Sequence, residues 1–424
     1  MATLRFPAAA IMVNRFFASR HQYSPQFWLI LGGLLIGTIG SSMVFPFLTI
    51  YVSEKLALPL TDVASLITLN GFIGLAASFV AGPITDRFGR KWVMVLSLIG
   101  NGVTYYLFRQ AETYLFFATL MAMRGLFHPM YKVGTSAMVT DLVTPEQRVD
   151  AFALMRTADN LGIAIGPAIG GFVAATSYNA SFTTASMTLL IFGLSIALFA
   201  QETVPREAPD IMGPEAKKRP SAGYGEVIKD RQFLAFVFSF TLFKICSVML
   251  WALLAVYAKQ NYGLPENQYG FIPTTNALMV VLFQVLATRI TRRYLPLPVM
   301  AVGTLVYALG VTSIAAGQGF WGFWLSFVVV TIGELMIMPT STTFVANLAP
   351  IDKRGRYMSF FSLSQGAGRG IAPLLGGLLN DHIGPKAIWY GGGLIGLASA
   401  ACYAVMGVYY APRKAAAREA NITR

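Results

Sequence analysis

Charged residues are scarce in this chain. Asp, Glu, Lys and Arg together make up 12% of its 424 residues, whereas 55% are hydrophobic and the mean hydropathy is +0.59. Soluble domains carry roughly 25% charged residues, and a chain this long with half that share could not cover its surface in water. The composition therefore excludes a soluble globular protein and predicts a polytopic membrane protein.

Cysteine is scarce too, with two residues in the chain. Cys246 and Cys402 each lie inside a long apolar run, and neither has a Cys or His neighbour at the spacing of metal ligands. These positions argue against a disulfide scaffold and a zinc site, so we expect no metal and no cofactor. The chain also lacks a nucleophile elbow and a Walker loop, which argues against an enzyme and against an ATP-driven pump.

Apolar runs, by contrast, are abundant. A membrane-spanning helix needs about 20 mainly apolar residues, and runs of this kind follow one another with short polar breaks. They predict an all-α polytopic membrane protein with twelve transmembrane helices. The twelve runs cover residues 27–51, 63–84, 92–108, 114–140, 148–175, 181–200, 233–258, 270–288, 297–316, 321–347, 357–380 and 387–410.

The distribution of positive charge predicts how these runs are oriented. Of the 32 Lys and Arg residues, 23 fall in the two termini and in the loops that join even-numbered to odd-numbered runs, against four in the opposite loops. Positive residues collect on the cytoplasmic side of membrane proteins, so we expect both termini in the cytoplasm. Topology then explains most of the net charge of +13, and nucleic acid is not needed as a partner.

Residues 202–231 form a long polar stretch with four prolines and equal numbers of acidic and basic residues. This composition is typical of a linker between domains. It divides the chain into an N-terminal six-helix bundle at 27–201 and a C-terminal six-helix bundle at 232–411. Residues 1–26 and 412–424 would be cytoplasmic tails, and the basic residues of the first fit a tail better than a transit peptide.

The two bundles resemble each other in sequence. A shift of 206 positions superimposes Arg148 on Arg354, Thr85 on Thr291, Arg87 on Arg293, Gly162 on Gly368, Pro167 on Pro373, Gly170 on Gly376 and Gly171 on Gly377. A constant offset of this kind indicates an internal repeat, so we expect two pseudo-symmetric bundles. Duplicated halves around a central site are the usual architecture of alternating-access transporters.

The loop between the second and third runs contains a complete motif, Gly-Pro-Ile-Thr-Asp-Arg-Phe-Gly-Arg-Lys, at residues 82–91. Gly82 permits two helices to approach closely, and Gly89 permits a tight turn. Asp86 at a helix end can hold a cation or the positive N-terminus of a neighbouring helix. A basic loop that only sets topology would not need Gly82 or Asp86.

This loop resembles the signature of the major facilitator superfamily, Gly-x-x-x-Asp-Arg-x-Gly-Arg-Lys, at every fixed position. The resemblance covers all twelve runs and implies the major facilitator fold. It also implies that Asp86 is a conformational latch, which bridges the two halves on the cytoplasmic side while the outward-facing state is populated. The other latch residues would be Gly82, Arg87, Gly89, Arg90 and Lys91, with Arg148 and Arg356 as partners. In the second half, the position 206 residues after Asp86 is Arg292, so we expect the latch aspartate in the first half only.

The fifth run contains a regular series of glycines. Three of them recur every four residues and form a smooth strip on one helix face, which permits close contact between helices. Generic membrane packing is one explanation. The ending Gly-Pro-x-x-Gly-Gly also resembles the antiporter signature of drug and proton exchangers in the superfamily, although its first glycine would fall at Ala153, and this resemblance implies efflux. The matching residues are Gly162, Gly166, Pro167, Gly170 and Gly171.

Ionisable residues inside the runs are candidates for function, because a charge within a membrane is costly. Arg124, His128 and Lys132 are four residues apart and share one helix face, which must look into a cavity or at acidic partners. Asp159 either pairs with Arg156 on its own helix or carries protons. The residues expected to line a substrate cavity are His128, Lys132, Arg156, Lys244, Trp251, Glu334 and Arg369.

Glu334 is the sharpest candidate for proton coupling. It has no basic residue within a turn on its own run, and a carboxyl partly shielded from water can exchange protons near neutral pH. Gly333, Glu334 and Pro339 also resemble the Gly-Glu pair and following Pro of the multidrug members, where the glutamate meets cationic drugs and protons. Arg124 stands where related exchangers have an arginine linked to proton coupling, although the glutamine-glycine pair that usually follows is absent. Glu334, Asp159 and Arg124 are therefore the expected proton-coupling residues.

These features favour a secondary active transporter that exports amphipathic drug-like molecules in exchange for protons. Five cationic residues against two carboxylates in the runs favour a second hypothesis, an exporter or flippase of an anionic metabolite or lipid headgroup. A sensor or scaffold without transport is a third hypothesis, which the complete latch motif argues against. We expect a monomer in the bacterial plasma (inner) membrane, with a small-molecule substrate, protons and membrane lipids as partners.

Overall fold

The computed structural model describes residues 22–204, 225–350 and 353–422, and these residues form helices and short connections. Two short helices, α8 (Gly225–Lys229) and α10 (Glu266–Tyr269), accompany the long ones. The long helices are α2 (Pro25–Leu56), α3 (Leu60–Phe88), α4 (Arg90–Phe108), α5 (Tyr114–Leu142), α6 (Arg148–Thr176), α7 (Tyr178–Phe199), α9 (Arg231–Tyr262), α11 (Phe271–Thr291), α12 (Pro296–Ser313), α13 (Gly319–Leu348), α14 (Arg354–His382) and α15 (Ala387–Ile422).

Each predicted run coincides with one long helix, and the helical architecture is therefore confirmed. Within the described ranges, nine helices are long and apolar enough to cross a membrane. The other three are α4, α5 and α14, in which charged residues such as Arg124 and Lys132 lower the hydropathy. Twelve membrane crossings therefore remain a prediction.

Local sequence explains where several helices begin. The first N–H groups of a helix have no partner within it, so a side-chain oxygen that accepts from them marks the start. Ser24 accepts from Phe27 N before α2, and Asp230 accepts from Phe233 N before α9. Proline interrupts several helices without ending them, as at Pro167 in α6, because neighbouring groups can satisfy the freed carbonyl.

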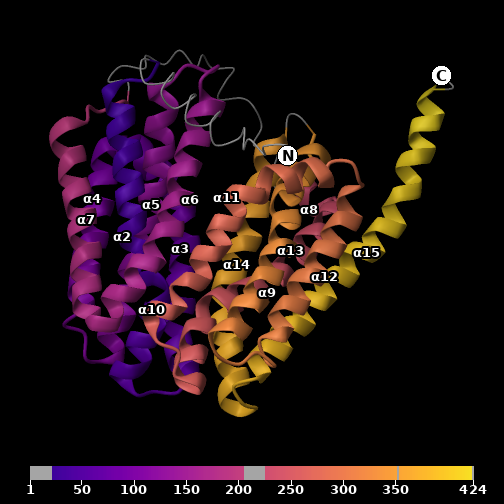
Figure 1. The fold of residues 1–424 in the computed structure, drawn as a ribbon. Coiled ribbons are helices and arrows are strands. Elements are labelled where there is room, and N and C mark those ends of the chain that lie inside the picture. The colour runs from indigo at the N-terminus through magenta and orange to yellow at the C-terminus, as the bar shows by residue number, and fades with distance from the viewer. Residues whose placement is uncertain (1–21, 205–224, 351–352, 423–424) are drawn as a thin grey trace, which may run out of the picture.

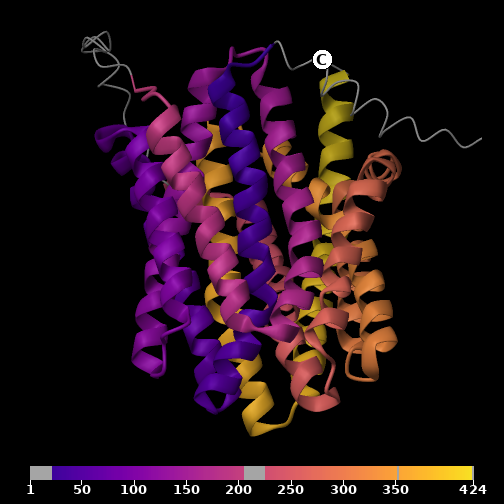
Figure 2. The ribbon, with the colours of Figure 1, turned by 60° about the vertical axis from the view of Figure 1, so that its left-hand side comes forward.

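The helices before residue 204 pack mainly on one another, and so do those after residue 225 (Figures 1 and 2). In the first group α2 packs on α6 and α7, and α5 packs on α3 and α4. In the second group α9 packs on α14 and α15, and α13 packs on α11 and α12. The groups meet where α3 contacts α14, where α6 contacts α10 and α11, and where α2 contacts α9.

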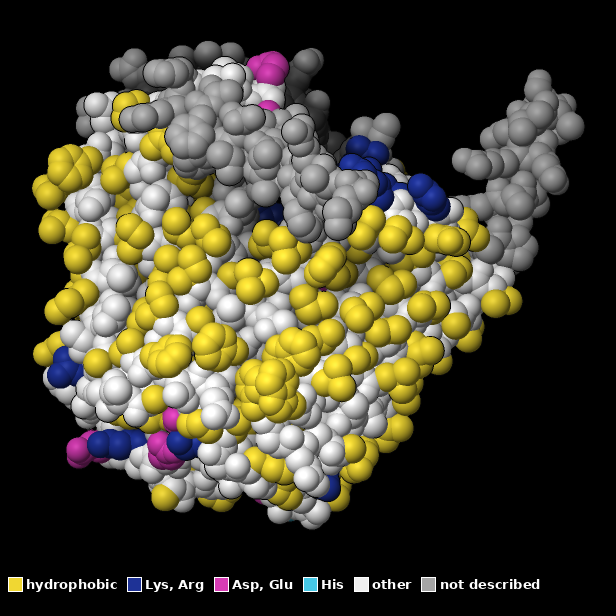
Figure 3. Space-filling model, in the orientation of Figure 1, with side chains coloured by type: hydrophobic (Ala, Val, Ile, Leu, Met, Phe, Trp, Pro, Cys, Tyr) yellow, Lys and Arg dark blue, Asp and Glu magenta, His cyan; other side chains and the backbone are white. Residues whose placement is uncertain are grey.

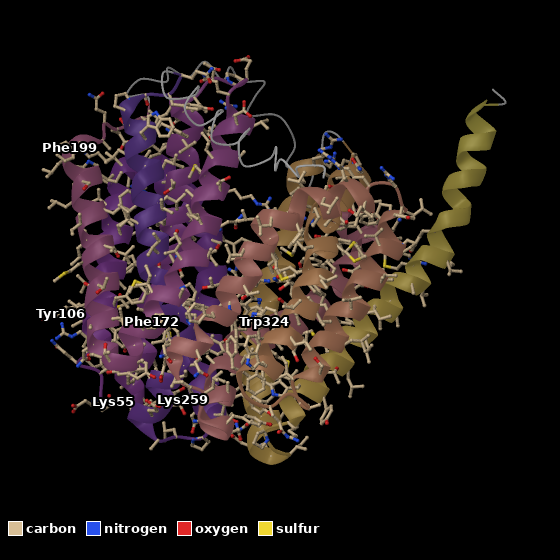
Figure 4. All side chains as sticks on the ribbon, in the orientation of Figure 1. Lys55, Tyr106, Phe172, Phe199, Lys259 and Trp324 are labelled. Atoms are coloured by element: carbon tan, nitrogen blue, oxygen red, sulfur yellow. The ribbon has the colours of Figure 1, made fainter. Side chains whose placement is uncertain are left out.

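The molecule has two polar ends that are separated by an apolar band. Hydrophobic side chains cover the middle of the surface in Figure 3, and Lys and Arg gather toward the two edges. The helix α2 starts, and α15 ends, at the same end of the molecule (Figure 2). We call this end the Arg90 face. The opposite end carries Lys55 and Lys259 (Figure 4), and we call it the Lys55 face.

Glycines set the distance between α6 and α2. A Cβ on Gly162 would lie 2.7 Å from the Cβ of Thr38, closer than two side chains can approach. The second half repeats this contact 206 residues later, where Gly368 of α14 lies against Lys244 of α9. The two halves of the chain therefore use the same helix contact at the same offset.

Candidate functional site

The carboxylate of Glu334 lies in the middle of α13 and is half-buried. The side-chain amide of Asn276, on α11, donates to Glu334 Oε2 at 2.8 Å and to Thr331 Oγ1 at 2.9 Å. Asn276 is itself buried, so its amide is fixed between the two helices. A fixed donor holds the carboxylate in one orientation.

Lys244 of α9 is the cationic side chain that interacts electrostatically with Glu334 of α13. Their charged atoms are too far apart to form an ion pair in this conformation, since no bridge within 4.0 Å joins them in the described chain. Lys244 also lies over the ring of Phe243 at 5.9 Å. Trp251, farther along α9, packs edge-on against Phe327 at 5.2 Å.

Arg124 is held by neutral groups rather than by an acid. Its Nε donates to the hydroxyl of Tyr105 at 3.3 Å, and its Nη1 donates to Asn70 Oδ1 at 3.4 Å. The guanidinium also lies over the ring of Phe45, 5.6 Å from the ring centre. Its positive charge is therefore left without a neutralising carboxylate among the residues that the structure describes.

Positive side chains from both halves face one another around Arg124. His128 lies within electrostatic range of Arg124, Lys132 and, from α14, Arg369. The side chains of His128, Lys132 and Arg369 are exposed. Arg369 of the second half thus adds a fourth basic group to the expected helix face of Arg124, His128 and Lys132. In the described residues no carboxylate forms an ion pair with any of them.

Asp159 lies on α6 and accepts a hydrogen bond from Thr38 Oγ1 at 2.9 Å. The alternative that Asp159 pairs with Arg156 is wrong for this conformation, because Arg156 is exposed and the two side chains form no ion pair in the described structure. Thr38 reaches Asp159 because Gly162, one turn farther along α6, brings α2 close.

The motif loop at 82–91 is fastened inside the first group of helices. The carboxylate of Glu202 accepts from Arg90 N at 2.9 Å and from Lys91 N at 3.1 Å, which satisfies the start of α4. Arg90 Nη1 lies 2.8 Å from Asp141 Oδ2. A pocket of about 470 Å³ lies beside this ion pair, and Lys132 is among its lining residues.

Asp86 itself is exposed and makes no hydrogen bond or ion pair with any described residue. Of its expected partners, Arg148 is exposed and Arg356 is half-buried, and neither forms an ion pair with Asp86 in the described structure. Gly89 has φ +91°, a conformation that favours glycine, as the expected tight turn requires. Arg87 is exposed and lies over the ring of Phe88 at 5.7 Å.

One expectation for this loop is wrong in the observed conformation. Gly82 was expected to permit a close helix approach, but no atom lies within 4 Å of the position its Cβ would take. The glycines that do meet the other helix lie farther from the Arg90 face. Gly71 of α3 lies against the backbone of Arg369, and Gly366 of α14 lies against Leu75.

The strip of glycines on α6 does lie in close contacts. Gly166 lies against Ile39 O, 2.9 Å from where a Cβ would be, and Gly170 lies against the backbone of Met43. The last part of the strip meets the other half of the chain. Gly171 lies against Glu266, and the carbonyl of Pro167 lies against Gly270. The strip therefore joins α6 to α2 on one side and to α10 on the other.

Sequence reasoning missed the two asparagines that orient the charged groups. Asn70 holds Arg124, and Asn276 holds Glu334. They stand 206 positions apart, so the repeat offset was a usable signal for them. It also missed Glu202 and Asp141, whose roles depend on a fold that brings distant residues to the loop.

Comparison with known proteins identifies the family. The sequence profile of the Major Facilitator Superfamily matches residues 30–265 and 242–424. The chain belongs to the major facilitator superfamily. Among curated members, a "Na(+), Li(+), K(+)/H(+) antiporter" from Planococcus maritimus is 27% identical over 364 residues, which cover 78% of this chain and 84% of that protein. "Multidrug resistance protein MdtH" of Escherichia coli strain K12 is 22% identical over 400 residues, 93% of this chain and 96% of the relative.

Solved structures of other transporters share the fold. The nucleoside transporter NupG superimposes with a TM-score of 0.75 at 14% identity and covers 90% of this chain and 98% of its own. A bacterial homologue of the human lysosomal transporter Spinster, in an inward-facing and occupied conformation, has a TM-score of 0.69 at 12% identity, with 91% and 96% covered. At these identities the likeness shows the fold alone.

Proposed function

We propose that this superfamily member is a secondary active transporter that exports amphipathic drug-like compounds in exchange for protons. The observation that carries the proposal is the Glu334 carboxylate, which lies between helices, accepts from Asn276 and interacts with Lys244. A carboxylate in such surroundings can bind a proton or a cationic group of a substrate, but not both at once. The proton-exchanging relative from Planococcus maritimus supports proton coupling, and the multidrug resistance relative supports the substrate class.

The proposed architecture is a major facilitator fold of twelve spans in two pseudo-symmetric six-helix bundles, residues 27–201 and 232–411. The Arg90 face would be cytoplasmic, with both termini on that side, and the membrane would be the bacterial inner membrane. The repeated helix contact at the offset of 206 supports the pseudo-symmetry. The excess of Lys and Arg in the loops of the Arg90 face supports the orientation.

Alternating access gives the site its mechanism. In the observed conformation hydrogen bonds join the halves at the Lys55 face, and His128 and Arg369 are exposed, so the proposed entry side is the Arg90 face. A substrate would enter there and contact Glu334, and rocking of the halves would then open the opposite side. A proton arriving from that side would displace the substrate from the carboxylate. Lys244 would neutralise the carboxylate in the moments when neither is bound.

Replacement of the carboxylate tests the coupling. Glu334→Gln keeps the shape and the hydrogen bond to Asn276 but cannot change charge, so export should no longer respond to a pH gradient. The measurement is accumulation of a fluorescent amphipathic cation in proteoliposomes with and without the gradient. Glu112→Gln, in an exposed loop, is the matched control and should export as the parent chain does. Undiminished gradient-driven export by Glu334→Gln would contradict the assignment.

A second candidate function is export of an anionic metabolite or flipping of an anionic lipid headgroup. One observation favours it. Five cationic residues lie deep inside the predicted runs, and none of them forms an ion pair with a carboxylate in the described ranges; they are Arg124, Lys132, Arg156, Lys244 and Arg369. Unpaired positive charge in a poorly hydrated space attracts anions and repels cations.

Ligand-induced stabilisation separates the two substrate classes. A ligand that binds the folded protein raises its unfolding temperature by mass action. We expect lipophilic cations to stabilise the purified protein in a thermal-shift screen at two pH values if the first candidate is right. Stabilisation by organic anions alone, abolished in Arg369→Gln, would instead establish the second candidate. Sugars serve as a neutral control.

A further inference from the structure

The contact between α3 and α14 closes the Lys55 face. A Cβ on Gly377 of α14 would lie 2.7 Å from Thr61 Cα at the start of α3, so the two backbones touch there. Farther along, the side chain of Leu75 lies against Gly366, 2.5 Å from where a Cβ would be. The two helices are therefore in close contact from the Lys55 face to about half their length.

A carboxylate of the second half of the chain completes this contact. Asp381, near the end of α14, accepts from Thr61 N with Oδ2 at 2.7 Å and from Leu60 N with Oδ1 at 3.3 Å. The side-chain amide of Asn380 donates to Asp381 Oδ1 at 2.8 Å and steadies the carboxylate. Asp381 therefore caps the N-terminus of a helix that lies 320 positions earlier in the sequence.

The helix α3 has no cap of its own. Its N-cap position is Pro59, which offers no side-chain acceptor, and the first N–H groups of a helix have no partner within the helix. A negative charge at this end is also favoured by the helix dipole. Both contributions are present only while α14 lies against α3 at the Lys55 face, so they stabilise the conformation in which that face is closed.

The other end of the same two helices shows the reverse arrangement. Asp86, near the end of α3, has no hydrogen bond or ion pair in the described structure, and α14 begins at Arg354 without a side-chain cap. The helices are antiparallel, so the last turn of each, which carries an aspartate, lies toward the end of the molecule at which the other helix begins. One aspartate is engaged and the other is free.

We propose that Asp381 is a latch of the Lys55 face, the counterpart of the Asp86 latch at the opposite end of the same helix pair. Rocking of the halves breaks the cap at Leu60 and Thr61 and closes the Arg90 face, where Asp86 becomes engaged. Asp381 thereby biases the protein toward the conformation that is open at the Arg90 face.

A second contact closes the same face independently. The hydroxyl of Tyr178 donates to Glu266 Oε1 at 2.5 Å, and Lys259 Nζ lies 3.0 Å from the same carboxylate. Tyr178 belongs to the first half of the chain and Glu266 to the second. Because this contact remains when Asp381 is changed, loss of the cap should shift the equilibrium without abolishing closure.

Distance measurements between spin labels test the proposal without substrate or a proton gradient, so they do not depend on the proposed coupling. Labels at Leu58→Cys and Lys386→Cys, both exposed at the Lys55 face on opposite halves, report its opening. The background replaces Cys246 and Cys402 with alanine and serine. Asp381→Asn keeps one oxygen acceptor but removes the negative charge, so it should raise the ratio of open to closed distances about twofold to fivefold, the range expected for loss of a charge at a helix N-terminus.

Asp62→Asn is the matched control, because it removes a carboxylate from the same first turn of α3 without touching the other half. It should leave the distances as in the parent. Asn380→Ala removes the hydrogen bond that steadies Asp381, so it should shift the ratio in the same direction by a smaller amount. It serves as the test variant if Asp381→Asn does not fold. Unchanged distances in the folded variants, or an equal shift in Asp62→Asn, would overturn the proposal.

Discussion

At the scale of single residues, neutral polar groups orient the charges of the site. Arg124 is held by Asn70 and Tyr105, and Glu334 is held by Asn276. A neutral partner leaves the charge available to a ligand, whereas an ion pair would cancel it. The equivalent positions of Asn70 and Asn276 indicate that the internal repeat supplied one orienting residue to each half, for an arginine on one side and a glutamate on the other.

This arrangement predicts that Asn276 acts through Glu334. Asn276→Ala removes a charge-assisted hydrogen bond worth about 1.5–3 kcal/mol, so proton-driven export should slow roughly tenfold or more. In the Glu334→Gln background the same change should have no further effect on coupling, because neighbouring residues that share one function are not additive. The measurement is a double-mutant cycle of export rates in proteoliposomes. Asn179→Ala, at an exposed position, is the control, and additive losses would contradict the prediction.

At the scale of elements, one face of the helix α3 packs against α14. Gly71, Leu75 and Gly82 share that face, since 11 residues make about three turns of an α-helix. The backbone of Arg369 lies against Gly71, while Gly82 has no neighbour within 4 Å of where its Cβ would be. This face of α3 is thus packed at Gly71 and Leu75, toward the Lys55 face, and open at Gly82, toward the Arg90 face.

The open half of the face predicts a conformation-specific effect of a side chain at Gly82. A Cβ at position 82 has no atom within 4 Å in the observed conformation, so the unfolding temperature of Gly82→Leu should stay within a few degrees of the parent. Closure of the Arg90 face would press the new side chain against α14, so export should slow markedly. Gly32→Leu, at another open position, should be harmless to both. Export at the parent rate by Gly82→Leu would show that α3 and α14 do not close there.

At the scale of the whole molecule, the two halves meet at one end. Six hydrogen bonds join residues before 204 with residues after 225 in the described chain, and all lie at the Lys55 face or in the adjacent half of the helices. One of them, from Thr274 Oγ1 to Ala164 O at 2.8 Å, lies nearest the middle. The hydrogen bonds between the halves are therefore concentrated toward the Lys55 face, and the proposed alternating access would require them to break as others form at the opposite end.

Much of the fold could be predicted from the sequence, because the signal for each helix lies in the helix's own residues. A run of apolar residues between polar breaks requires no knowledge of its neighbours, and the expected run 148–175 differs from α6 (Arg148–Thr176) by one residue at its end. Some helices extend farther than expected. The helix α15 continues to Ile422, past the expected end at 410, because the residues beyond the apolar run are still good helix formers.

The chain's scarcity of charge determined by itself that it belongs in a membrane, and its motifs determined the family, because hydropathy and spacing are properties of residues near one another in the sequence. The partners of the charged residues were decided only by the tertiary structure. Asp159 binds Thr38, and Asp381 caps α3, because helix packing brings together residues more than a hundred positions apart. Which end of the molecule is closed likewise depends on how the two halves pack against each other. These contacts join residues that are far apart in the sequence, so no local sequence pattern predicts them.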